Sequence, residues 1–192
     1  MKKFLTLKNI VVVSGFALAL AVFVMSFFAK FTLDLDGTRA SFIHIVWGSD
    51  YIVAPGYDPI PIKVEIHADR CQPAVLLLIG NLLVIVGAIA AALVALLVKK
   101  PWAKWVVVGC AVLVLAGAVM QFFAVPSFMR AMTETVGKVE GMSQEQINQR
   151  YMEIMSDMPK YHPAIGVSIA AGVVGVVAAL GLGASQFLPE KK

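Results

Sequence analysis

Four side chains of metal-ligating type alternate along the segment VEIHADRC, which begins at Val64. In a β-strand, whose side chains point alternately to two faces, Glu65, His67, Asp69 and Cys71 would share one face. Carboxylate, imidazole and thiolate groups are ligands for zinc and copper. Neighbours in such a row lie about 7 Å apart, so the row alone cannot surround one ion.

A metal site here would need His67 and Asp69 to meet His44 from a neighbouring strand. Ordinary sheet alternation explains the same pattern without a metal, because one face of a strand packs on protein while the other meets water. Ordinary alternation is therefore the preferred interpretation, and these three residues stay as the candidate ligands.

A second candidate is the M-x-x-M pattern of Met152, Met155 and Met158. Thioethers can hold Cu(I). The three residues also fall on the apolar face of a predicted helix, where methionine is a common packing residue. The sequence contains no G-x-S-x-G, H-E-x-x-H, C-x-x-C or Walker-type motif. We therefore predict a protein that is not an enzyme and that holds neither a metal nor another cofactor.

The elements that would position these residues belong to a membrane protein. The chain has 192 residues, of which 59% are hydrophobic and 15% charged, against about 25% charged in soluble domains. Four apolar runs reach the roughly 20 residues needed to cross a bilayer. The first run follows a basic start as a signal peptide does, but its length and the bulky Phe27 at its exit favour a retained anchor.

Charge predicts the orientation of the four spans. The chain ends and the short segment between the second and third spans carry eight basic residues against Glu190, whereas the two long segments carry eight basic and eleven acidic residues. The positive-inside rule places both termini and the Lys99–Lys104 turn in the cytoplasm. The net charge of +4 thus indicates membrane orientation and does not indicate nucleic-acid binding. Trp102 and Trp105 are predicted membrane-interface anchors.

The first long segment is predicted to form short strands, and the second to form helices. Asp36-Gly37 lies between alternating runs and favours a hairpin, and a later strand is expected over Ile60–Ala68. In the second segment, Ser143 and Gln146 have capping-box spacing, and Gly141 is expected to end a preceding helix. Cys71 and Cys110 lie too far apart in depth to pair, since a disulfide needs Cα atoms within about 7 Å.

Small residues recur every four positions in two spans, which lets helix backbones approach closely. Packing within the chain is the preferred interpretation, with packing against another protein as the alternative. The residues predicted at these faces are Ala171, Gly175, Ala179, Gly183, Gly87, Ala91 and Ala95. Those predicted for interaction outside the membrane are Ile147, Tyr151, Ile154 and Met158.

The layout of four spans, a large β-rich first outer segment and cytoplasmic ends resembles that of claudin-type tetraspan proteins. Trp47-Gly48 resembles part of the claudin tryptophan-glycine motif. The paired cysteines that follow this motif in claudins are absent, because Cys71 is the only cysteine of the outer segments. The resemblance therefore extends to topology and one dipeptide, and implies an architecture only.

We predict an all-α four-helix transmembrane bundle with a small extracytoplasmic α+β cap. Its predicted role is that of an accessory or scaffold subunit. The predicted partners are the lipid bilayer and another integral membrane protein or a copy of itself, and no nucleic-acid partner is predicted. Two alternatives stay open: a passive channel or permease with Asn81, Gln121 and Ser14 facing one lumen, and a sensor with a pocket near His44, His67 or Trp47. The lysine-rich ends and cysteine-poor exterior are typical of a bacterial plasma membrane.

The predicted boundaries are a cytoplasmic N-terminus at 1–9, spans at 10–29, 73–98, 102–124 and 164–187, outer segments at 30–72 and 125–163, a cytoplasmic turn at 99–101 and a cytoplasmic C-terminus at 188–192.

Overall fold

The structure is a computed structural model. It describes residues 6–28, 30–33, 38–41, 51–54, 62–65, 75–123, 126–127, 129–130, 133–134, 137, 141–156 and 162–188. Five helices are defined within these ranges: α1 (Leu7–Phe28), α3 (Val75–Leu97), α4 (Ala103–Phe122), α6 (Gln144–Ser156) and α7 (His162–Ser185). The chain forms two compact units, which are described separately.

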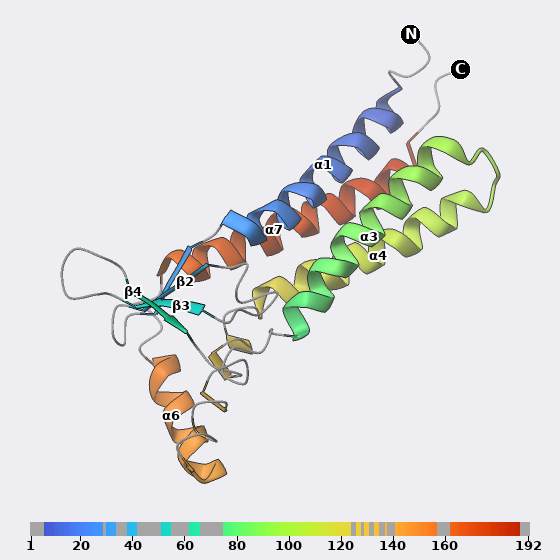
Figure 1. The fold of residues 1–192 in the computed structure, drawn as a ribbon. Coiled ribbons are helices and arrows are strands. Elements are labelled where there is room, and N and C mark those ends of the chain that lie inside the picture. The colour runs from blue at the N-terminus through green and yellow to red at the C-terminus, as the bar shows by residue number, and fades with distance from the viewer. Residues whose placement is uncertain are drawn as a thin grey trace. The chain divides into compact units, whose positions relative to one another are not determined.

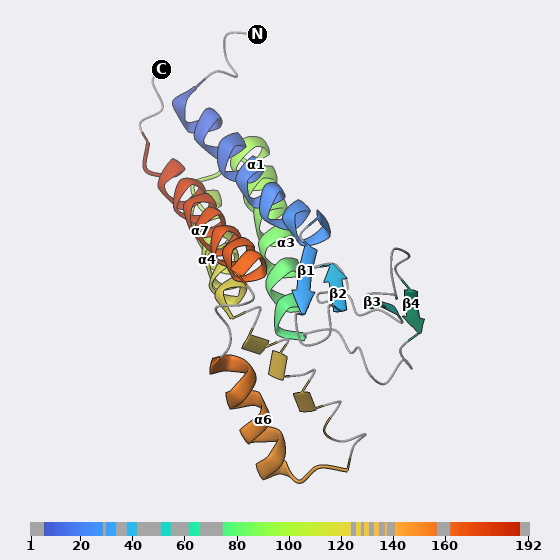
Figure 2. The ribbon, with the colours of Figure 1, turned by 90° about the vertical axis from the view of Figure 1, so that its left-hand side faces the viewer.

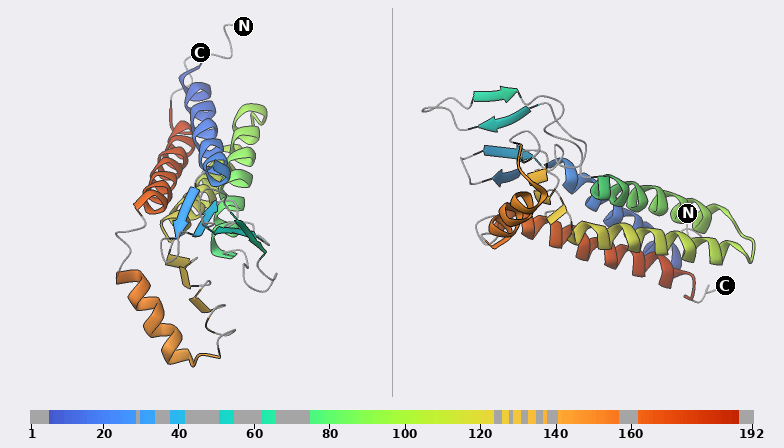
Figure 3. Two further views of the ribbon diagram at one scale, coloured as in Figure 1. Left: turned by 60° about the vertical axis from the view of Figure 1, so that its left-hand side comes forward. Right: turned by 90° about the horizontal axis from the view of Figure 1, so that it is seen from below.

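The first unit, here called the bundle unit, comprises Met1–Met25, Ile79–Phe122 and Ala170–Lys192. Within it α1, α3, α4 and α7 lie side by side, as Figures 1 and 3 show. Each of these helices contains a stretch of at least 19 residues that is long and apolar enough to cross a membrane. A helix satisfies its backbone hydrogen bonds within itself, which is why apolar sequences of this length adopt it in lipid. The expectation of four membrane-spanning helices is confirmed.

The core of the bundle unit is built from small and branched side chains of all four helices. Val12 of α1, Val84 of α3, Val114 of α4 and Leu182 of α7 are completely buried. Long apolar side chains point outward instead, among them Leu93 and Leu180. Such a bundle is suited to lipid. Small buried residues let the helices pack closely, and large apolar side chains can face lipid tails, which are as apolar as leucine.

The second unit comprises Ser26–Leu78 and Phe123–Ile169. It contains a four-stranded antiparallel sheet with the strand order β1-β2-β3-β4. The strands are β1 (Lys30–Leu33), β2 (Thr38–Ser41), β3 (Tyr51–Ala54) and β4 (Ile62–Glu65). The pairing of Leu33 with Thr38 places the connection of the first hairpin over residues 34–37. Its Asp36-Gly37 dipeptide lies outside the described residues.

The predicted fold class needs a correction, because the α+β cap is not seen as a folded layer in the part of the chain that the structure describes. Each strand has four residues, or about 13 Å at about 3.3 Å per residue. The strands β2 and β3 are joined at one register pair, Arg39 with Val53. The four strands thus form one small sheet, in which a single described register pair joins the two hairpins (Figure 2). The finding that stands is the helical bundle.

Of the strand predicted over Ile60–Ala68, the structure describes Ile62–Glu65, which form β4. The strand β4 ends at Glu65, the first residue of the alternating polar row. The remaining members of that row, His67, Asp69 and Cys71, lie outside the described residues. A shared strand face for all four side chains therefore has no support in β4, and their role as ligands stays a prediction.

Helix α6 begins where the sequence analysis places its cap. The Ser143 N–H donates to Gln146 Oε1 over 2.8 Å, and the Gln146 N–H donates to Ser143 Oγ over 3.3 Å. This reciprocal pair is the predicted capping box, which is confirmed. Just before it, Gly141 adopts a φ of 70°, and the Met142 N–H donates to the Gly137 carbonyl over 2.8 Å. These are features of a Schellman motif, which ends a helix at a glycine.

Candidate functional site

Helices α3 and α4 of the bundle unit cross in close contact at two glycines. A Cβ atom built on Gly117 would lie 2.5 Å from the carbonyl oxygen of Gly80 and 2.8 Å from Cγ2 of Val84. A Cβ atom on Gly80 would in turn lie 3.0 Å from Cβ of Met120 and 3.3 Å from Nε2 of Gln121. Since non-bonded carbon and oxygen atoms do not approach so closely, only glycine fits at position 117.

The predicted small-residue face of α7 packs within the chain. A Cβ atom on Gly175 would lie 2.6 Å from Cβ of Ala118, and one on Gly183 would lie 3.6 Å from Cβ of Ala111. The other two members of this face, Ala171 and Ala179, are buried. This face therefore meets α4 of the same chain.

The small-residue face of α3 is also occupied within the chain. A Cβ atom on Gly87 would lie 3.0 Å from Cγ2 of Val114 on α4 and 3.1 Å from the Cys110 carbonyl oxygen. Ala91 is completely buried, and Ala95 packs against the same core. Association of either face with another protein stays a prediction, and a partner would have to displace these contacts.

Other glycines at helix contacts were not among the predicted residues. Gly15 of α1 packs against Ala178 and Leu182 of α7, and Gly172 packs against the ring of Phe122. The missed signal for α3 was the spacing of Gly80 and Gly87, because seven residues are close to two helical turns and place both on one face. A search for small residues every four positions did not detect this seven-residue spacing.

The polar side chains inside the spans do not share a lumen. Asn81 and Gln121 are buried, with exposures of 0% and 1%, and they adjoin the Gly80–Gly117 crossing in sequence and in contact. Ser14 is exposed on α1. The two amide atoms of Asn81 have no hydrogen-bond partner in the described part of the structure. The channel alternative required all three residues to face one path, and the structure does not bring them together.

In the second unit, α6 is held by two contacts with the helical residues that precede it. Ile147, 2% exposed, packs with its side chain against Gly137. The guanidinium of Arg130 lies 5.2 Å from the centroid of the Tyr151 ring, and its Nε donates to Glu134 Oε1 over 2.6 Å. Cation–π contacts of this kind contribute about 0.5–1 kcal/mol at exposed sites.

The residues predicted for interaction outside the membrane thus divide into two groups. Ile147 is used within the second unit, and Tyr151 and Ile154 are half-buried. Met158 lies outside the described residues. Met152, which was considered as a copper ligand, is 71% exposed, whereas Met155 is half-buried. The largest apolar exposure on α6 is therefore Met152.

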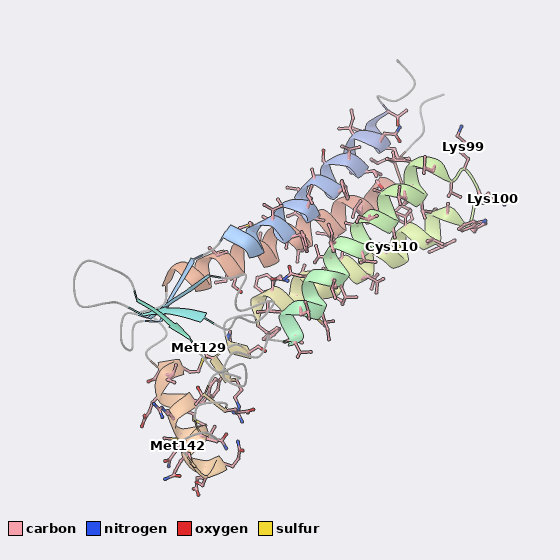
Figure 4. All side chains as sticks on the ribbon, viewed as in Figure 1. Lys99, Lys100, Cys110, Met129 and Met142 are labelled. Carbon is pink, nitrogen blue, oxygen red and sulfur yellow. The ribbon has the colours of Figure 1, made fainter. Side chains whose placement is uncertain are left out.

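The remaining site predictions fall outside the described ranges or stay untested. His44, His67, Asp69 and Trp47, which serve the metal and sensor interpretations, are among the undescribed residues. In the part that is described, no three histidine, cysteine, aspartate or glutamate side chains gather around one point. Cys110, half-buried on α4, has a free thiol (Figure 4).

The predicted interface anchors lie at the start of α4. Trp102 and Trp105 are exposed, and the Nζ of Lys104 lies 5.7 Å from the Trp105 ring and 4.4 Å from the ring of Phe187. Lys99 and Lys100 lie in the turn between α3 and α4 (Figure 4). Exposed tryptophans beside lysines are typical of the headgroup region of a bilayer.

Four apolar helices define the class: the chain is a multi-pass membrane protein with four membrane-spanning helices that contact the lipid bilayer. Comparison with known proteins takes the identification no further, because no protein family, no characterised protein and no solved structure is significantly similar to the chain. The architectural resemblance to claudin-type proteins accordingly carries no family relationship.

Proposed function

We propose that this tetraspan protein is a non-enzymatic accessory or scaffold subunit that binds another membrane protein or a second copy of itself. The observation that carries this proposal is the Gly80–Gly117 crossing. Two buried polar side chains, Asn81 and Gln121, lie next to this crossing, which supports an interior that serves helix packing. We therefore place the function on the surface of the molecule, where it would bind the partner.

Helix α6 is the surface that best fits such a role. It is fixed at its start by the Ser143 capping box and along its length by the buried Ile147, so it presents its outer face in one orientation. That face is polar except for Met152. A rigid helix with one exposed flexible apolar side chain suits a contact with another protein, because methionine adapts to irregular partner surfaces.

The test is site-specific cross-linking in the native membrane. A photoreactive amino acid replaces Met152 in one variant and, as a control on the same helix, Gln149 or Ser156 in two others. The proposal expects one discrete product, formed more strongly from position 152 than from the control positions. A product of twice the chain mass assigns self-association, and a different mass assigns a partner subunit.

The same experiment can refute the proposal. Labelling of equal strength at all three positions, or labelling of lipid alone, would show that α6 has no preferred protein contact. A low-molecular-weight adduct confined to position 152 would instead favour the sensor alternative, in which the second unit binds a small ligand.

A further inference from the structure

One end of the bundle unit contains a pocket of about 710 Å³ that four lysines line. Lys8 belongs to the first turn of α1, Lys99 and Lys100 to the turn after α3, and Lys104 to the first turn of α4. Thus three separate segments of the chain bring lysine residues to one opening. The volume lies within the range of about 300–1,000 Å³ that is typical of small-ligand sites.

These four lysines are the only charged residues in the described part of the bundle unit. Residues 6–25, 79–122 and 170–188 contain no aspartate, glutamate, arginine or histidine. Mutual repulsion of the lysines makes a bound anion favourable.

The chemistry of the lining favours a phosphate group over a simple anion. Each ammonium group has three N–H donors, and phosphate presents several acceptor oxygens that can be shared among them. Thr6, Asn9 and Gln186 also line the pocket. The Thr6 Oγ1 accepts the Asn9 N–H over 3.3 Å, which leaves its hydroxyl hydrogen to donate outward.

The surroundings of the pocket indicate where the phosphate comes from. Lys104, which lines the pocket, sits over the rings of Trp105 and Phe187. Trp105 is 68% exposed and Phe187 is 63% exposed, as expected for aromatic side chains in the headgroup layer. The pocket walls add apolar residues of α3 such as Leu96. Phospholipid phosphates occupy the same layer of the membrane.

We propose that this pocket binds a phosphate group, presented by the headgroup of an anionic phospholipid. Clusters of lysines at the ends of membrane helices attract anionic lipids, and here the cluster also has a cavity of headgroup size. This proposal is independent of the accessory role above, since it concerns only the bundle unit.

Lipid binding can be measured by native mass spectrometry of the full chain in detergent. Dioleoyl-phosphatidylglycerol is titrated in parallel with dioleoyl-phosphatidylcholine, whose headgroup has no net charge. The expected result is tighter binding of phosphatidylglycerol. The double variant Lys99→Gln/Lys104→Gln should bind it about 25-fold more weakly, because each lysine near a lipid surface contributes a factor of about five.

Two controls separate this site from general attraction to charge. Lys63→Gln removes a lysine of β4, which belongs to the second unit, and should leave the affinity unchanged. Lys99→Arg keeps the charge and should lose less than Lys99→Gln. The melting temperature of each variant without lipid is recorded to ensure that only folded protein is compared.

Inorganic phosphate as a competitor distinguishes the source of the group. If phosphate at about 10 mM does not displace phosphatidylglycerol, the site is assigned to lipid. Displacement that also depends on Lys99 and Lys104 supports the phosphate site but assigns a soluble ligand. Equal loss of affinity in Lys63→Gln and in the double variant, or equal affinity for the two lipids, would overturn the proposal.

Discussion

Gly117 of α4 lies directly against Gly80 of α3, so closely that a Cβ atom at position 117 would come within 2.5 Å of the Gly80 carbonyl oxygen. Backbone atoms cannot move aside as a flexible side chain can. This crossing therefore depends on the absence of a side chain at one position, and its sensitivity to a single methyl group can be measured.

We expect Gly117→Ala to lower the stability of the bundle by about 1–3 kcal/mol, the cost typical of overpacking. Thermal unfolding in detergent, followed by circular dichroism, gives the change. Gly109→Ala on the same helix is the matched control, since a Cβ atom there meets nothing within 4 Å. Equal effects of the two variants would show that the crossing is looser than described.

Asn81 supplies a second prediction, about water in the bundle. Its side chain is completely buried and adjoins the glycine crossing, so Asn81→Cys should react with a charged, membrane-impermeant thiol reagent no faster than the background. The background is a chain in which Cys71 and Cys110 are replaced by alanine, and Met152→Cys, exposed on α6 outside the spans, controls for reagent access to an exposed thiol. Rapid modification at position 81 would revive the channel alternative.

The buried amide also predicts an unusual effect on stability. Asn81→Leu should leave the melting temperature unchanged or raise it, because the variant replaces a buried polar group without a hydrogen-bond partner by an apolar one of similar size. Asn81→Ala, which opens a cavity instead, is the comparison and should be less stable than Asn81→Leu. The opposite order would mean that the amide makes a favourable interaction in the membrane.

The fourth prediction concerns how α6 is held. Ile147→Ala should destabilise the second unit by about 2–5 kcal/mol, as the loss of a buried aliphatic side chain does. Met152→Ala on the exposed face should change stability by about 0.5 kcal/mol or less. Hydrogen exchange of the α6 amides reports both effects, and similar protection in the two variants would contradict the described packing of Ile147 on Gly137.

The features that were predictable from sequence are those governed by local chemistry. Four spans follow from apolar length, and the start of α6 follows from the spacing of Ser143 and Gln146, because both depend on residues adjacent in the chain. The contact of Gly175 with Ala118 was not predictable, since a small-residue pattern gives a helix face but not the helix that it meets. Of the segment VEIHADRC, the structure describes Val64 and Glu65, which lie in β4, and its polar row stays a prediction.

The lysine pocket was also not predictable from the sequence, because its residues are distant along the chain. Lys8 and Lys104 are 96 positions apart in sequence, and their charges were interpreted only as signals of membrane orientation. Their convergence requires the start of α1 to lie beside the turn between α3 and α4. What the sequence did contain was the absence of acidic residues, apart from Glu190, from the spans and the short segments near them, a regional property that needs no fold to be recognised.

The turn between α3 and α4 has a consequence for how the protein is made. Only residues 98–102 separate the two helices, and three lysines in or beside that turn resist transfer across a bilayer. Neither helix can then cross alone and wait for the other, so we expect the ribosome-bound chain to deliver them as a single hairpin. The hairpin would close from its turn outward, through Gly87 and on to Gly80, so the crossing of Gly80 and Gly117 is the last of these contacts between the two helices to form.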